Sequence, residues 1–129
     1  MSPELVGRKS ELISLRRAIT KEGGAVLVGS AGVGKTRLAR EAVKSSGFRW
    51  VAATADAATI PYGPLIAALP GVSPELAPGA QVEAVRAALE EVETLVVDDA
   101  HLLDAASATL IHHLAVERAV PVLATIRAG

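Results

Sequence analysis

Eight residues of the sequence have the types and spacing of a phosphate-binding loop. Residues 29–36 read Gly-Ser-Ala-Gly-Val-Gly-Lys-Thr, which matches the pattern G-x-x-x-x-G-K-[ST] at every fixed position. Glycines let the backbone approach a phosphate chain closely, and the backbone N–H groups then bind the anion. We expect Lys35 to reach the β- and γ-phosphates of a nucleotide and the Thr36 hydroxyl to ligate Mg²⁺. The nucleotide-binding residues predicted here are Gly29, Ser30, Ala31, Gly32, Val33, Gly34, Lys35, Thr36 and Arg37.

A pair of carboxylates forms a second candidate group. Residues 95–99 read Leu-Val-Val-Asp-Asp, an apolar run that ends in two acids. Because a buried carboxylate without a partner is costly, acids at this place indicate a nearby cation. Beside a phosphate-binding loop, the pair predicts that Asp98 holds Mg²⁺ and that Asp99 orients or deprotonates the attacking water. The alternative interpretation is an Asp pair that opens a surface turn and caps a helix.

Four further side chains, one arginine and three histidines, are candidates for the site. Arg127 follows an apolar strand and could contact the γ-phosphate, or it could be an ordinary solvated arginine. We interpret His101, which follows the acidic pair, as a loop histidine without a role. His112 and His113 are consecutive in a predicted helix, so they point to different faces and cannot chelate one metal ion. The predicted catalytic residues are therefore Lys35, Asp99 and Arg127, and the nucleotide's Mg²⁺ is the only metal ion expected.

Strands and helices must alternate to bring these groups together. Apolar runs predict strands at residues 25–28, 48–54, 94–98 and 119–125. Helical spacing predicts helices at residues 12–19, 37–44, 65–69, 82–92 and 108–115, with Ser10 and Asp104 as N-caps and Gly23 as a stop. This alternation predicts βαβ units and a parallel sheet. The phosphate-binding loop should then lie at the carboxyl edge of that sheet, where α/β folds bind ligands.

Composition narrows the class of protein. The chain of 129 residues is 50% hydrophobic but has one Phe, one Trp and one Tyr, which predicts a single domain with an aliphatic core. A net charge of −1 argues against a basic surface for nucleic acid. The sequence contains no cysteine, no signal peptide and no apolar run near the ~18 residues of a membrane span. We therefore expect a cytoplasmic domain with no membrane contact.

Several blocks of the sequence resemble a known family. Residues 5–12 are similar to the "VGR…EL" box of AAA+-related ATPases, and residues 97–104 and 125–127 resemble blocks of STAND-type signalling ATPases. Residues 60–65 are similar to a segment of the large ATP-binding, MalT-like regulators of the LuxR family. The resemblance covers nearly all of the chain and implies a three-layer P-loop NTPase core of the AAA+ type that uses ATP or ADP and Mg²⁺. It also implies that Val6 and Arg8 lie near the adenine and that Arg127 senses the γ-phosphate.

The resemblance also predicts what this chain lacks. Members of this family continue beyond a fourth strand into a fifth strand, a helical lid, a sensor domain and a DNA-binding helix-turn-helix. We expect residues 1–129 to form a single, incomplete ATPase core that makes no direct nucleic-acid contact. In the family's sheet order, 5-1-4-3-2, the strand at residues 25–28 would be left at an open edge. Such an edge favours pairing with another copy, so we expect self-association.

Three functions are compatible with these features. An ATP-binding conformational switch with slow Mg²⁺-dependent hydrolysis, acting in a signalling or transcription regulator, is favoured. A mechanical or DNA-handling AAA+ ATPase is the first alternative, although it requires a second lid domain and an arginine finger. A small-molecule kinase is less favoured, because it needs a lid rich in arginine and the basic residues between positions 48 and 94 are only Arg49 and Arg86. A GTPase is disfavoured, since no [NT]-K-x-D motif occurs.

Overall fold

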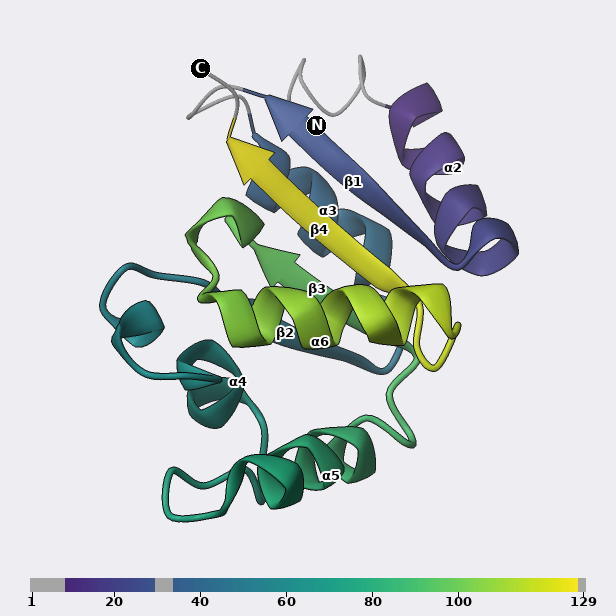
Figure 1. The fold of residues 1–129 in the computed structure, drawn as a ribbon. Coiled ribbons are helices and arrows are strands. Elements are labelled where there is room, and N and C mark those ends of the chain that lie inside the picture. The colour runs from purple at the N-terminus through teal and green to yellow at the C-terminus, as the bar shows by residue number, and fades with distance from the viewer. Residues whose placement is uncertain (1–8, 30–33, 128–129) are drawn as a thin grey trace.

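A parallel sheet of four strands lies at the centre of the molecule (Figure 1). The computed structural model describes residues 9–29 and 34–127. The strands are β1 (Gly24–Gly29), β2 (Phe48–Ala52), β3 (Thr94–Asp98) and β4 (Val122–Arg127). Their spatial order is β1-β4-β3-β2, and each neighbouring pair runs parallel. This order matches the expected one for the first four strands, and the α/β fold class predicted from the sequence is confirmed.

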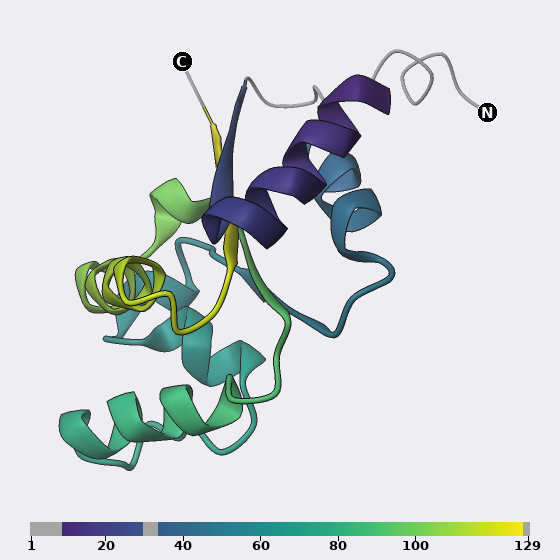
Figure 2. The ribbon, with the colours of Figure 1, turned by 90° about the vertical axis from the view of Figure 1, so that its right-hand side faces the viewer.

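Helices cover both faces of the sheet and make the three layers (Figure 2). On one face lie α2 (Lys9–Arg17) and α3 (Lys35–Val43). On the other lie α4 (Gly63–Ala68), α5 (Pro78–Ala88) and α6 (Ala105–Val116). Three short turns complete the described chain: a π turn at Ala18–Glu22 and 3-10 turns at Ala57–Thr59 and Ala100–Leu102.

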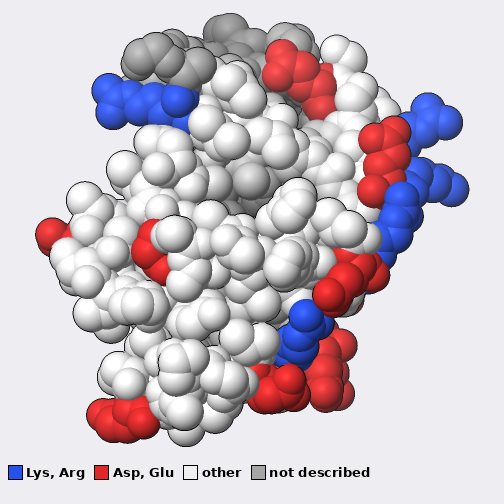
Figure 3. Space-filling model, in the orientation of Figure 1, with Lys and Arg blue, Asp and Glu red and all other residues white. Residues whose placement is uncertain are grey.

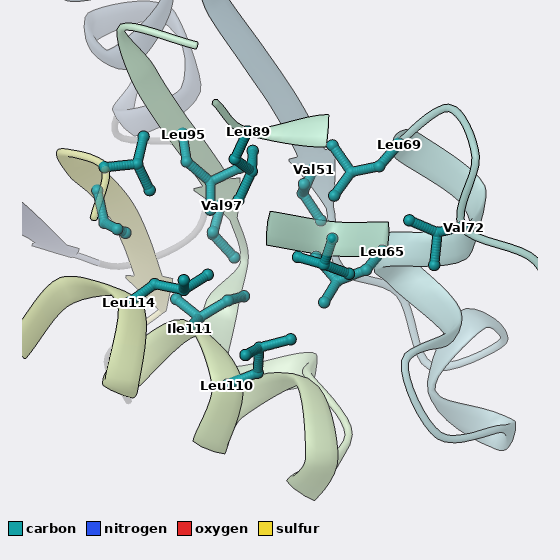
Figure 4. Packing of buried hydrophobic residues seen from close by; sticks show 13 residues of the cluster. Val51, Leu65, Leu69, Val72, Leu89, Leu95, Val97, Leu110, Ile111 and Leu114 are labelled. Atoms are coloured by element: carbon teal, nitrogen blue, oxygen red, sulfur yellow. The ribbon is translucent and has the colours of Figure 1, made fainter. Parts of the chain in front are cut away.

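Alternating side chains of the strands divide the core into two clusters. In β3, Val96 packs with Leu38 and Val43 of α3, on the face covered by α2 and α3. Its neighbours Leu95 and Val97 point the opposite way, toward the cluster of α4, α5 and α6 (Figure 4). All four strand-core side chains of β3, from Thr94 to Val97, are buried. The aliphatic core expected from composition is thus present on both faces, and it fixes β3 at the centre of the sheet.

Some element boundaries differ from the sequence-based prediction. Ser10 lies inside α2, which begins at Lys9, so the prediction of Ser10 as its N-cap is wrong. Helix α5 begins at Pro78, earlier than predicted, because proline is well accommodated in the first turn of a helix. The N–H of Ala119 donates a hydrogen bond to the carbonyl oxygen of Leu114 at 3.0 Å, at the end of α6. Strand β4 therefore begins later than predicted, at Val122. At its other end β4 extends beyond the predicted Thr125 to Arg127, which pairs with Gly29 of β1.

Strand β1 forms one edge of the sheet. Within residues 9–29 and 34–127, it pairs with β4 and with no strand on its outer side. Val26 and Val28 point away from α2 and α3 and are 57% and 63% exposed.

The face that carries α6 is largely uncharged at its centre, and charged side chains gather along its right side and lower end (Figure 3). In the part of the chain that the structure describes, no helix has the length and apolarity needed to cross a membrane.

Candidate nucleotide site

The two ends of the predicted phosphate-binding loop lie close together. Gly29 ends β1, and Gly34 precedes α3 with φ 82°, a left-handed conformation that favours glycine. The ammonium group of Lys35 donates a hydrogen bond to the carbonyl oxygen of Gly29 at 2.9 Å. The side chain of Lys35 therefore spans the mouth of the loop, where phosphates are expected to bind. Ser30, Ala31, Gly32 and Val33, together with Val6 and Arg8, lie outside the described residues.

The first helical turn of α3 contacts the end of β3. The hydroxyl of Thr36 donates to the Asp98 carboxylate, with its oxygen 3.1 Å from Oδ1 and 3.2 Å from Oδ2. A second hydroxyl, that of Thr125 in β4, donates to Asp98 Oδ1 at 2.6 Å. The two residues predicted as Mg²⁺ ligands, Thr36 and Asp98, are thus in direct contact. One carboxylate and one hydroxyl suit Mg²⁺, which prefers oxygen donors and is usually bound by one or two protein ligands together with phosphates and water.

Asp99 turns away from the line of β3. Its backbone has φ 57° and ψ 49°, a left-handed conformation that is uncommon outside glycine. The N–H of Asp99 donates to Thr125 Oγ1 at 2.8 Å, which holds the turn. Asp98 and Asp99 therefore point in different directions: Asp98 contacts Thr36, and Asp99 lines the adjacent cleft.

A cleft of about 660 Å³ opens at this edge of the sheet. Four lysine or arginine side chains line the cleft, and Asp99 is the one acidic residue among the described residues of its wall. Such a balance suits a ligand with several negative charges, since anions are bound by arginine and lysine groups. The lining residues are Gly34, Lys35, Thr36, Arg37, Arg40, Asp99, His101, Leu102 and Arg127.

Three residues of this region were missed or given no role by the sequence analysis. His101 lies in the cleft wall, and its Nδ1 accepts a hydrogen bond from the Arg127 N–H at 3.2 Å. Arg40 also lines the cleft, and its guanidinium stacks over the Trp50 ring at 4.2 Å. Thr125 is fully buried and joins both acidic residues. The available signal for Thr125 was a hydroxyl residue within an apolar strand, two positions before Arg127.

The structure brings together the predicted residues that it describes. Lys35, Thr36, Arg37, Asp99 and Arg127 line one cleft, and Asp98 joins it through Thr36. His112 and His113 belong to α6, where their ring centroids lie 6.2 Å apart, and they are not among the described residues that line the cleft. Within the described residues, 9–29 and 34–127, no group of three or more His, Asp or Glu side chains is arranged to hold a metal ion.

Comparison with known proteins assigns the family. The family described as the AAA ATPase domain matches residues 4–125. The crystal structure of Pif1 helicase from Candida albicans has a similar fold, with a TM-score of 0.58 and 16% sequence identity. That match covers 98% of this chain but 32% of the helicase, so the chain spans about a third of its length, and the likeness concerns the fold alone. No match was found among curated proteins.

Proposed function

The chain belongs to the AAA ATPase domain family, and from this premise we propose that it binds Mg-ATP in the cleft and hydrolyses it slowly. The observation that carries the proposal is the contact of Thr36 with Asp98 beside the turn at Asp99. This contact joins the phosphate-binding loop to the acidic pair, although the two motifs are distant in sequence. Both are required for phosphoryl transfer by P-loop ATPases.

Each residue of the site would have a separate role in hydrolysis. Lys35 and the loop N–H groups would bind the β- and γ-phosphates, and Thr36 and Asp98 would hold Mg²⁺. The bound metal ion would neutralise phosphate charge as the bond to the leaving ADP breaks. Asp99 lies in the cleft wall, where its carboxylate can orient a water and accept its proton as the water attacks the γ-phosphorus. Arg127 also lines the cleft and would supply positive charge to the developing transition state.

We further propose that nucleotide binding acts as a conformational switch in a larger signalling or transcription regulator. The resemblance of residues 5–12, 60–65, 97–104 and 125–127 to STAND-type ATPases supports this role. The hydrogen bond from the Arg127 backbone to His101 supplies a physical route, because it ties the end of β4 to the cleft wall. A γ-phosphate that attracts the Arg127 side chain would therefore pull on β4.

The test is release of phosphate from Mg-ATP by the isolated chain, with no phosphate acceptor present. We expect slow release that Asp99→Asn slows further by about 100-fold and that single-stranded DNA leaves unchanged. Formation of ADP only when a small-molecule acceptor is added would contradict the proposal and favour a kinase. Stimulation by single-stranded DNA would instead favour the DNA-handling alternative, which the net charge of −1 makes less attractive.

A further inference from the structure

The hydroxyl of Thr125 lies at the junction of β3, β4 and α3, where it contacts both members of the acidic pair. Thr125 is fully buried. Its hydroxyl donates to Asp98 Oδ1 at 2.6 Å and accepts from the Asp99 N–H at 2.8 Å. A threonine hydroxyl has a single O–H to donate, so this donor is committed to Asp98. Thr125 therefore links the carboxylate of one acid to the backbone of the next.

Packing alone does not explain a threonine at this position. Two residues earlier in β4, on the same face, Leu123 is fully buried in the apolar cluster under α3. Valine has the same shape as threonine and is favoured in strands, and it would bury no polar atom. A buried hydroxyl is costly unless it is hydrogen-bonded, and here both of its bonds go to the acidic turn. The hydroxyl thus serves the turn rather than the core.

The two bonds constrain two different features of the site. The bond to Asp98 fixes one carboxylate oxygen, while Thr36 approaches both oxygens of the same carboxylate from α3. The bond from the Asp99 N–H holds a backbone at φ 57°, a left-handed conformation that carries a steric cost for a non-glycine residue. Without it, the turn would lose the hydrogen bond that opposes this cost, and the Asp99 side chain would lose its fixed direction.

We propose that Thr125 is a positioning residue for ATP hydrolysis, acting through Asp98 on the metal ion and through Asp99 on the attacking water. The proposal rests on the proposed function of the cleft. Thr125 is not among the described residues that line the cleft, so we assign it no contact with the nucleotide. Its loss should therefore leave metal-free nucleotide binding unchanged and weaken the steps that need the two acids.

The test compares Thr125→Val, which removes the hydroxyl at constant shape, with Thr125→Ser, which retains it. Three quantities are measured on the full chain: ATP affinity in EDTA, ATP affinity in Mg²⁺, and the single-turnover hydrolysis rate. For Thr125→Val we expect affinity in EDTA within about twofold of wild type, at least a fivefold loss of the Mg²⁺-dependent gain in affinity, and at least a tenfold slower rate. Thr125→Ser should recover each quantity to within about threefold, because a hydroxyl alone restores both hydrogen bonds.

Several outcomes would overturn the proposal. A Thr125→Val protein that keeps the Mg²⁺ effect and the rate within twofold shows that the hydroxyl positions nothing. Equal losses in EDTA and in Mg²⁺ would show a general disturbance of the loop instead. Thr125→Ala is the second hydroxyl-free variant, in case valine packs badly; if neither folds while Thr125→Ser does, the hydroxyl is structural and the proposal is wrong. Failure of the proposed function is distinct, since wild-type protein would then bind no ATP in either buffer.

Discussion

The Thr36 hydroxyl lies 3.1 Å from a carboxylate oxygen of Asp98, although 62 positions separate the two residues in the chain. The contact forms because α3 begins beside the end of β1, and β4 alone separates β1 from β3 in the sheet. In the proposed function, Thr36 and Asp98 would together hold a magnesium ion that accompanies ATP.

Replacing the two acids one at a time should separate binding from hydrolysis. Asp98→Asn should weaken the Mg²⁺-dependent part of ATP affinity, because it removes a charged metal ligand. Asp99→Asn should preserve affinity and slow hydrolysis by about 100-fold, the lower end of the usual contribution of a general base. Calorimetric titration with Mg-ATP and single-turnover phosphate release measure the two effects. Identical profiles for the two variants would contradict the separate roles of the acids.

Removing the Arg127 side chain should reduce discrimination between ATP and ADP. Arg127 lines the cleft, and its backbone contact with His101 does not depend on its side chain. Arg127→Ala should therefore lower ATP affinity more than ADP affinity, because only ATP offers a γ-phosphate to the guanidinium. Arg49→Ala is the control, since Arg49 is exposed on β2 and outside the cleft lining. A parallel loss of both affinities in Arg127→Ala would contradict γ-phosphate sensing.

Asp104 should stabilise the fold at neutral pH and lose that effect in acid. Its carboxylate caps α6 at the Ser107 N–H and also accepts from the Tyr62 N–H, each at 3.0 Å. Burial alone would raise the pKa of Asp104, but the neighbouring Ser107 hydroxyl and these backbone groups together lower the pKa below its ordinary value. A lowered pKa means that the stabilisation is complete above the unfolded-state value of about 4 and is lost as pH falls through the folded-state value.

The corresponding variant is Asp104→Ala, which should lower the free energy of unfolding by about 1 kcal/mol at pH 7. Thermal unfolding of wild type and variant at several pH values between 7 and 3 would show the difference shrinking in acid. Asp56→Ala is the matched control, because the Asp56 side chain makes no capping hydrogen bond to its 3-10 turn. A difference in unfolding temperature that stays constant with pH would contradict this role of the carboxylate.

The open edge of β1 should promote self-association. Val26 and Val28 of this uncharged strand are 57% and 63% exposed, and among residues 9–29 and 34–127 no strand pairs with its outer side. Light scattering over a concentration series should show association that Val28→Lys reduces and that Mg-ATP partly suppresses by stabilising the native state. Ile13→Lys is the control, because Ile13 is similarly exposed, at 66%, but belongs to helix α2 and not to the edge strand. A wild-type chain that stays monomeric at several hundred micromolar would show that the edge is protected.

The parts of the site that follow local rules could be predicted from the sequence, and those that depend on tertiary contacts could not. The phosphate-binding loop and the apolar strand before Asp98 can each be recognised from a few consecutive residues. The strand order followed from the family resemblance and is observed here. Thr36 and Asp98 were each predicted from their own motif as Mg²⁺ ligands, and the two side chains are in contact. The Thr125 contacts were missed because they join β4 to a turn 26 and 27 positions away. His101 was given no role because its partner, the Arg127 backbone, carries no side-chain signal.

Helix boundaries show the same division. The Asp104 cap of α6 was predicted correctly, because a capping aspartate acts on its own helix within one turn. The Ser10 cap was wrong because α2 begins at Lys9, before the apparent capping residue. The start of α5 at Pro78 agrees with the local preference of proline for the first helical turn, a signal that the apolar spacing from Val82 onward does not contain. Apolar spacing therefore identifies the helices, whereas their ends depend on further residues outside that spacing.

The most direct test of the central claim is the affinity of Lys35→Ala for Mg-ATP. The Lys35 ammonium lies 2.9 Å from Gly29 O at the mouth of the phosphate-binding loop, and the core does not depend on it. Lys44→Ala is the matched control, because Lys44 is exposed at the other end of the same helix and pairs with Glu41 at 2.7 Å. Calorimetric titration should give at least a tenfold loss for Lys35→Ala, about 1.4 kcal/mol or more, at an unchanged unfolding temperature, and no loss for Lys44→Ala. A Lys35→Ala protein that keeps its affinity within about threefold of wild type would contradict nucleotide binding at this site.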